Sequence, residues 1–283
     1  MSVFGRVIPL TGCQVNRSTN MNLQVSNRFI SLLVAAVGAL SLACEARAQS
    51  NFTTLHSFTA LQSPAINGDG QYPVAELLVM GGALYGTASR GGVVGSGTLF
   101  SMNPDGTGFT NLHNFGGITD GGAPTAGLVC AANVLYGALD FGGPAFKGGV
   151  FAINNDGSGF RYLHTFARGD FNAFGFFTNR DGAGPEGGLV LSGNVLYGTT
   201  VTGGPFGAGA LFAVNTDGTG FTNLHFFDAL ANRGPAINRD GGRLSAELVL
   251  GGDVLFGATE IGGEAGVGTI FSIHIDGTGF QKL

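Results

Sequence analysis

Four histidines recur at one place in the sequence, and histidine is the side chain that most often binds metals or transfers protons near neutral pH. Each follows a leucine in the motif Leu-His-x-Phe, at His56, His113, His164 and His225. They could converge as a ring of ligands, or each could fill the same packing niche in its own repeat. The second interpretation is favoured, because a metal site would need further converging ligands. No metal site is therefore predicted.

Acidic residues recur too, in a second set of Asp-Gly pairs between the repeated blocks. These pairs are Asp69-Gly70, Asp120-Gly121, Asp181-Gly182 and Asp240-Gly241, and three have an asparagine two residues earlier, at Asn67, Asn179 and Asn238. Calcium prefers such oxygens, but a calcium loop usually supplies several carboxylates and each of these supplies one. Turn formation is the favoured role, because Asp and Asn bond to nearby backbone and Gly accepts positive φ.

The least repetitive segment is residues 167–182 (ARGDFNAFGFFTNRDG). Loops on a rigid scaffold are where binding residues concentrate, and exposed aromatic rings stack on sugars or on protein partners. The sequence therefore predicts a binding surface made of Phe171, Phe174, Phe176 and Phe177. The alternative is that these rings fold back and fill a gap in the core.

Catalytic motifs do not stand out. The sequence contains no Gly-x-Ser-x-Gly, and no P-loop lysine follows its glycine-rich strings. The sequence predicts no catalytic residue and no cofactor, and a non-enzymatic role is favoured. An enzyme would need non-repeated residues to meet in the fold, and the scattered candidates are Tyr72, Tyr162, Arg90 and Glu260. Two functions stay open: a non-catalytic binding or structural module of unknown ligand, and a polysaccharide-active hydrolase or lyase.

The elements that position these residues recur as a block with two halves. The first half spans 76–92, 127–143, 188–204 and 247–263, and the second spans 97–115, 148–166, 209–227 and 268–283. Each half contains two alternating apolar runs around a tight turn, and Asp-Gly between such runs is typical of a β-hairpin. No segment shows the 3.6-residue apolar period of a helix, so the chain is expected to contain almost no helix.

Four strands in a unit of about 50 residues match a kelch-like propeller blade. The fold expected is all-β: a β-propeller of about four tandem four-stranded repeats, roughly residues 52–108, 109–159, 160–220 and 221–283. The absence of Trp excludes WD40-type blades. An incomplete part of a larger propeller and a β-solenoid stay open as alternatives. Phe-x-x-Leu occurs both at Phe52 and at Phe280, and these two copies would compete for one place in a four-blade ring.

The first 48 residues differ from this glycine-rich array. Arg28 precedes an uncharged apolar run at 29–43, and Ala46-Arg47-Ala48 resembles a cleavage site. This order predicts a leader with a secretory signal peptide over 1–48, a repeat domain over 49–283, and no transmembrane segment after cleavage. We expect a secreted, extracellular or cell-surface protein, with the periplasm also possible. The net charge of −5 argues against nucleic acid as a partner.

The motifs Leu-Tyr-Gly-Thr-Thr-x-x-Gly-Gly, Gly-x-Gly-Thr-Leu-Phe, Asp-Gly-Thr-Gly-Phe and Leu-His-x-Phe together resemble the GloVer (Gloeo_Verruco) tandem repeat of exported bacterial proteins. The resemblance covers roughly residues 52–283. It implies a propeller-like fold and surface or extracellular placement, and it brings no catalytic residues. Such proteins often have a C-terminal sorting tail, and none follows Leu283 here, so both a four-repeat chain and a piece of a longer array stay open. An extracellular glycan or a cell-surface protein is the expected partner.

Overall fold

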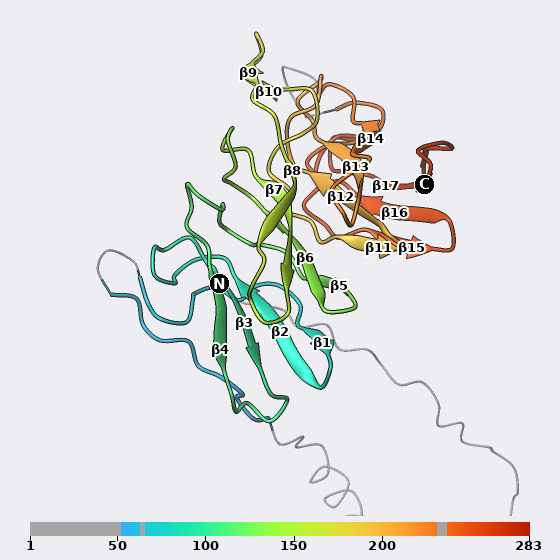
Figure 1. The fold of residues 1–283 in the computed structure, drawn as a ribbon. Helices are drawn as coiled ribbons and strands as arrows, with labels where there is room; N and C mark the ends of the chain where they lie inside the picture. Colours follow the sequence, from blue (N-terminus) through green and yellow to red (C-terminus); the bar gives the residue numbers. More distant parts are fainter. Residues whose placement is uncertain (1–51, 63–65, 231–236) are drawn as a thin grey trace, which may run out of the picture. The chain divides into compact units, whose positions relative to one another are not determined.

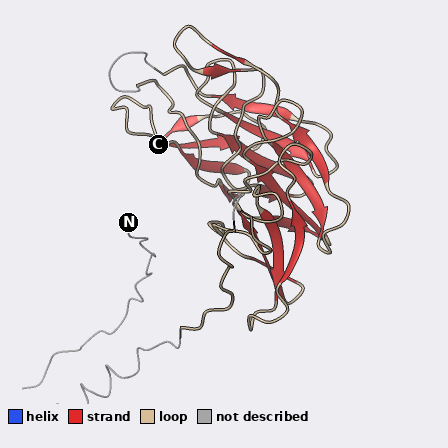
Figure 2. Cartoon of the chain, turned by 90° about the vertical axis from the view of Figure 1, so that its left-hand side faces the viewer, coloured by secondary structure: helices blue, strands red, loops and turns tan. Residues whose placement is uncertain are grey.

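The computed structural model describes residues 52–62, 66–230 and 237–283. The leader and signal peptide expected over 1–48 lie outside these residues. In the described part the chain forms four four-stranded antiparallel sheets and one two-stranded hairpin (Figures 1 and 2). It contains no helix there, and so none long and apolar enough to cross a membrane. The prediction of an all-β chain with four-stranded repeats is confirmed.

The strands of every sheet follow one another in sequence order. Sheet 1 contains β1 (Leu78–Met80), β2 (Ala83–Ala88), β3 (Thr98–Met102) and β4 (Thr110–Asn114). Sheet 2 contains β5 (Val129–Ala131), β6 (Val134–Leu139), β7 (Gly149–Asn154) and β8 (Arg161–Thr165). Sheet 3 contains β11 (Val190–Ser192), β12 (Val195–Thr200), β13 (Ala210–Asn215) and β14 (Thr222–Phe226). Sheet 4 contains β15 (Val249–Gly251), β16 (Val254–Ala258), β17 (Ile270–His274) and β18 (Gln281–Lys282).

The third and fourth strands of each sheet meet at the repeated Asp-Gly turn. In sheet 1, Asp105 accepts hydrogen bonds from the backbone N–H of Thr107 at 2.9 Å and from its hydroxyl at 2.7 Å. These bonds lower the pKa of Asp105. Gly106 follows with a φ of 85°, which residues with a Cβ rarely adopt. The sheets are offset from the repeat boundaries drawn on the sequence, because residues 110–114 complete sheet 1 and do not open the second unit.

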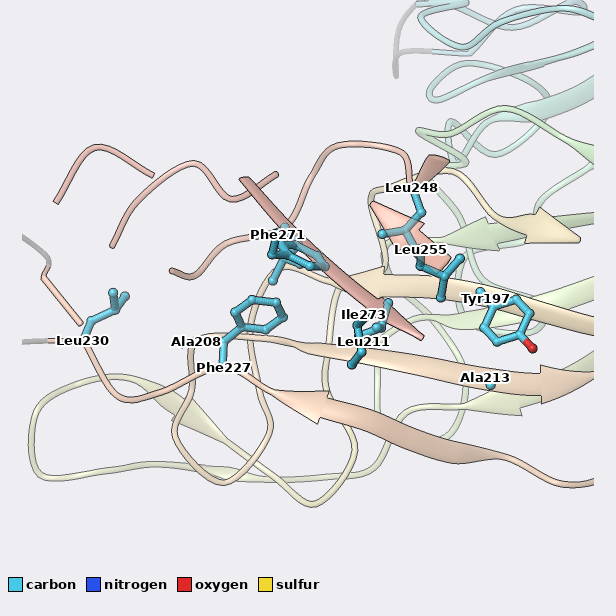
Figure 3. Close-up of a cluster of buried hydrophobic side chains, with 11 residues drawn as sticks. Tyr197, Ala208, Leu211, Ala213, Phe227, Leu230, Leu248, Leu255, Phe271 and Ile273 are labelled. Atoms are coloured by element: carbon cyan, nitrogen blue, oxygen red, sulfur yellow. The ribbon is translucent and has the colours of Figure 1, made fainter. Parts of the chain in front are cut away.

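Three buried cores join consecutive sheets: sheet 1 to sheet 2, sheet 2 to sheet 3, and sheet 3 to sheet 4. Figure 3 shows the last of these, where Phe227 and Leu211 of the third repeat lie near Phe271 and Ile273 of β17. A fully buried phenylalanine recurs in the third strand of every sheet, at Phe100, Phe151, Phe212 and Phe271.

The glycine of the repeated Leu-Tyr/Phe-Gly motif makes room for this ring. In sheet 3, a Cβ on Gly198 would lie 2.5 Å from Cζ of Phe212 and 2.8 Å from Cδ2 of Leu189. Real atoms do not approach that closely, so only glycine leaves room for the edge of the ring against the neighbouring strand. The same relation holds for Gly137 with Phe151 and for Gly257 with Phe271.

The two copies of Phe-x-x-Leu lie in different places. The C-terminal copy forms β18 of sheet 4, whereas His56 of the N-terminal copy stacks on Phe109 of sheet 1 at 3.8 Å. In the described part of the chain, none of the three cores joins sheet 4 to sheet 1. Ile270 of sheet 4 is accordingly 60% exposed, while Leu99 and Leu211 at the aligned position are fully buried.

Candidate functional site

The recurring histidines and the recurring Asp-Gly pairs form one structural unit, which we call the His–Asp junction. In each unit Nε2 of the histidine lies within hydrogen-bonding distance of an aspartate Oδ2: His56–Asp69 at 3.1 Å, His113–Asp120 at 2.7 Å, His164–Asp181 at 3.1 Å and His225–Asp240 at 2.8 Å. Each imidazole also stacks on a phenylalanine of the following sheet, namely Phe109, Phe160, Phe221 and Phe280. Three of the junctions therefore tie neighbouring sheets together, and the junction of His56 ties the segment before β1 to sheet 1.

The carboxylate oxygens of the aspartates in these junctions accept hydrogen bonds from groups of the protein itself. Besides its histidine, Asp181 accepts the backbone N–H of Ala167 at 3.0 Å. At Asp69, burial acts to raise the pKa, but hydrogen bonds from Thr59 and His56 together lower it. Each histidine serves its own junction, and the described residues contain no group of three or more His, Cys, Asp or Glu side chains that could hold a metal. The geometry matches the packing and turn interpretations of both sets.

The segment 167–182 forms the hairpin of β9 (Asp170–Phe171) and β10 (Phe177–Thr178). Asn172 fixes its turn, because its Oδ1 accepts the backbone N–H groups of Phe174 at 3.0 Å and Phe176 at 3.1 Å. The four phenylalanines divide into two pairs. Phe171 and Phe174 are 73% and 64% exposed, whereas Phe176 packs on the core between sheets 3 and 4, and Phe177 is half-buried.

A pocket of about 470 Å³ lies beside this hairpin. Its lining combines apolar atoms of Pro144, Ala145 and Phe166 with the side chains of Arg168 and Arg180. Close by in sequence, Lys147 Nζ lies 3.9 Å from the ring centroid of Phe177, a cation–π contact. We call this set the aromatic–cationic surface: Lys147, Arg168, Phe171, Phe174, Phe177 and Arg180.

A second pocket, of about 390 Å³, shares Pro144 with the first and is lined by Ile118, Phe146 and Tyr162. The Tyr162 hydroxyl is buried without a hydrogen-bond partner within the described residues. Burial, together with the nearby charge of Asp120, raises the pKa of Tyr162 to about 12. Asn223 occupies the aligned position of sheet 3, and its side chain donates a hydrogen bond to the carbonyl of Asp181. Tyr162 therefore differs from the aligned residue in both type and hydrogen bonding.

A different group of side chains comes from one aligned position in each repeat, and of these only Glu260 stood out from the sequence. The same backbone N–H donates there to the same carbonyl: Ser89 to Tyr72, Asp140 to Ala123, Val201 to Gly184 and Glu260 to Arg243. The backbone hydrogen bond is constant, while the side chain is a hydroxyl in the first repeat, a carboxylate in the second and fourth, and an aliphatic group in the third. Comparing the four repeats column by column would have shown that this position varies, together with the next one, between the constant Leu-Tyr/Phe-Gly motif and the constant Gly-Gly pair.

Two of these four side chains are carboxylates, Asp140 and Glu260. A third carboxylate, Glu186, comes from a different position and has a pKa that responds to the charges of both, and we call the three the acidic group: Asp140, Glu186 and Glu260. Burial raises the pKa of Asp140. The pKa of Glu186 is raised by burial first, then by the charges of Asp140 and Glu260, and Arg243 partly offsets this. Arg243 itself lies 3.8 Å from Glu260. Raised carboxyl pKa values are a feature of catalytic and binding sites as well as of structural networks.

The scattered residues named from the sequence do not form one site. Arg90 lies over the ring of Tyr72 at 5.9 Å, and Glu260 accepts a hydrogen bond from Ser245 and lies near Arg243. Tyr162 lies in a third place, beside Asp120. Glu260 alone joins the acidic group.

These features define a tandem-repeat all-β protein whose sheets are held by His–Asp junctions and whose non-repeated side chains gather at a few places. Residues 44–176 match the Gloeobacter/Verrucomicrobia repeat, the family that the motifs predicted. No curated protein matches the sequence.

Solved structures similar to the chain include a chain of the nidogen/laminin complex and TolB. A chain of the nidogen/laminin complex is 13% identical with a TM-score of 0.41, and the match covers 72% of this chain and 58% of that one. TolB from Acinetobacter baumannii is 15% identical with a TM-score of 0.47, and the match covers 82% of this chain and 45% of TolB. The match therefore spans less than two thirds of the length of either protein.

Proposed function

We propose that this protein is an exported, non-catalytic binding module on a β-propeller-type scaffold, and that it binds an extracellular glycan through the aromatic–cationic surface. The observation that carries the proposal is the pair of exposed rings, Phe171 and Phe174, on a hairpin whose turn is fixed by Asn172. Large apolar rings are normally buried, so two exposed rings beside a pocket favour a ligand-binding role.

The scaffold and the location of this module rest on separate observations. The stacking of each sheet on the next through a continuous core supports a propeller or part of a larger one. The apolar run and cleavage motif before residue 49 support export. Outside the cell, glycans are abundant ligands whose flat apolar faces stack on aromatic rings.

The double substitution Phe171→Ala/Phe174→Ala is expected to weaken glycan binding by about 10-fold or more, because each stacked ring contributes about 1 kcal/mol. Affinity electrophoresis against a panel of soluble plant and microbial polysaccharides measures this. Val94→Ala is the control, since Val94 is also an exposed apolar side chain but lies in the loop between β2 and β3 of sheet 1. Binding that survives the double substitution unchanged would remove the hairpin from the proposal.

A polysaccharide-active enzyme is the second candidate, and the acidic group is the observation that favours it. A carboxylic acid with a raised pKa is the proton donor that glycosidic cleavage requires. Within the acidic group, Asp140 and Glu186 have this property. Release of reducing or unsaturated ends from a polysaccharide panel, abolished by Glu186→Gln, would support this candidate over the binding module.

Asp140→Asn is expected to stabilise the protein at neutral pH. Burial raises the pKa of Asp140 above its ordinary value of 3.8. Between the ordinary pKa and the raised pKa, the folded state binds more protons than the unfolded state, so stability falls as the pH rises through this interval. The uncharged amide removes this cost, so the advantage should vanish below pH 3.8. Urea midpoints at the two pH values measure it.

Asp217→Asn is the control of opposite sign. Hydrogen bonds from Thr219 lower the pKa of Asp217, so its contribution is present above the ordinary pKa of 3.8 and is lost as pH falls. This variant should be less stable than the wild type at neutral pH. Equal midpoints for Asp140→Asn and the wild type at neutral pH would contradict the burial of an ionised carboxylate at Asp140.

A further inference from the structure

We infer that the ligand of the aromatic–cationic surface is an acidic polysaccharide, and that Arg168 and Arg180 bind its carboxylate groups. This inference rests on the proposed function, in which the ligand is a glycan, and it specifies that this glycan is negatively charged. It comes from the distribution of cations, from a comparison of two aligned repeats, and from the pocket.

Positive charge is scarce in this protein and is concentrated at one place. The chain has 13 lysines and arginines against 18 acidic residues. Those in the described part are Arg90, Lys147, Arg161, Arg168, Arg180, Arg239, Arg243 and Lys282. Three of them belong to the aromatic–cationic surface. The hairpin of this surface also carries Asp170, which is exposed and offsets one of these charges, so the surface keeps a net positive charge. In an acidic chain such a local excess of cations attracts anionic ligands over neutral ones.

In the next repeat, the arginine at the equivalent position is paired with a carboxylate. There Arg239 forms an ion pair with Asp228 at 3.1 Å. Arg180 occupies the aligned position, but the residue aligned with Asp228 is Ala167. Equivalent hydrogen bonds support this alignment. The backbone N–H of Ala167 donates to Asp181, and the backbone N–H of Asp228 donates in the same way to Asp240. The side-chain amide of Asn179 donates to the carbonyl of Ala167, and that of Asn238 donates to the carbonyl of Asp228. The counter-ion of Arg180 has therefore been replaced by a methyl group.

A second cation follows directly, because Arg168 is the residue after Ala167. Both arginines line the pocket of about 470 Å³. Within the described residues neither makes an ion pair or a side-chain hydrogen bond, whereas Lys147 is engaged with Phe177. A guanidinium binds a carboxylate through two parallel hydrogen bonds, which suits a uronic acid whose ring stacks on a neighbouring aromatic side chain.

The test is Ala167→Asp, which rebuilds in this repeat the ion pair of the next one and leaves both arginines in place. We expect binding to polygalacturonate to fall about 10-fold, while binding to its fully methyl-esterified form stays weak and unchanged. Asp228→Ala is the matched control: it frees Arg239 on the next repeat and should not reduce binding. Arg168→Gln/Arg180→Gln is the second variant, and it should remove the preference for the acid form without a change in the circular dichroism spectrum.

The outcomes separate this inference from the proposed function. The wild type could bind polygalacturonate and its methyl ester equally, and lose both in Phe171→Ala/Phe174→Ala. This result would overturn the inference but would still support a glycan-binding module. Equal binding of dextran sulfate would overturn the assignment to carboxylates. Binding of poly-glutamate but of no polysaccharide would overturn both, as would no binding to any polysaccharide. A loss with Ala167→Asp and none with Asp228→Ala supports the inference.

Discussion

Phe212→Ala is expected to lower the free energy of unfolding by about 3–5 kcal/mol, the usual cost of removing a fully buried ring. Phe212 is completely buried in the core between sheets 2 and 3. Its ring lies 5.4 Å from that of Phe166 and 5.8 Å from that of Phe221, with Gly198 against its edge. Neighbours held by two sheets collapse poorly into a cavity, so the cost should lie in the upper part of the range. Urea denaturation followed by circular dichroism measures it.

Phe206→Ala is the control for this prediction, because Phe206 lies in the same repeat but is 43% exposed. Its effect should stay within about 1 kcal/mol. If Phe212→Ala cost no more than Phe206→Ala, sheets 2 and 3 would not share a packed core.

Asp181→Ala should destabilise the protein by about 2–3 kcal/mol, because a buried carboxylate that satisfies two donors is lost. His164 Nε2 at 3.1 Å and Ala167 N at 3.0 Å would both lose their acceptor. The stacking of His164 on Phe221 would also lose the hydrogen bond that orients the imidazole. The change in the urea midpoint measures this effect.

Asp253→Ala is the matched substitution, since the Asp253 side chain is exposed and lies 3.6 Å from His274. It should shift the free energy of unfolding by less than about 0.5 kcal/mol. A similar small shift for Asp181→Ala would mean that the His–Asp junction contributes nothing to the association of the sheets.

The repeats and their strands could be predicted because the determinants are local. Alternating apolar runs around Asp-Gly turns specify each hairpin within a few residues, as at Asp105 and Gly106. The His–Asp junction could not, although both of its members were noticed separately. Its partners are 13, 7, 17 and 15 residues apart in the four copies, so no constant spacing connects them. The histidine and the aspartate come together only in the folded chain, which accommodates loops of different length between them.

The candidate site was predicted in part, for a related reason. Non-repetition located the hairpin, but the direction of each phenylalanine depends on the turn at Asn172, which turns Phe176 toward the core and leaves Phe174 in solvent. The acidic group escaped prediction because its members come from different repeats. Each carboxylate is isolated in sequence, and the interaction between Glu186, Asp140 and Glu260 exists only once the sheets are stacked.

Each core in the described part of the chain joins only sheets that are neighbours in sequence. The free energy of such an array is a sum over units and their contacts with the next unit, as in a one-dimensional chain. Recombination that exchanges or duplicates a whole unit therefore keeps every junction intact as long as the His, Asp and Phe of the junction are present. The loop and the aligned position that vary between units are then free to diverge, and one scaffold can acquire new ligands by shuffling its units.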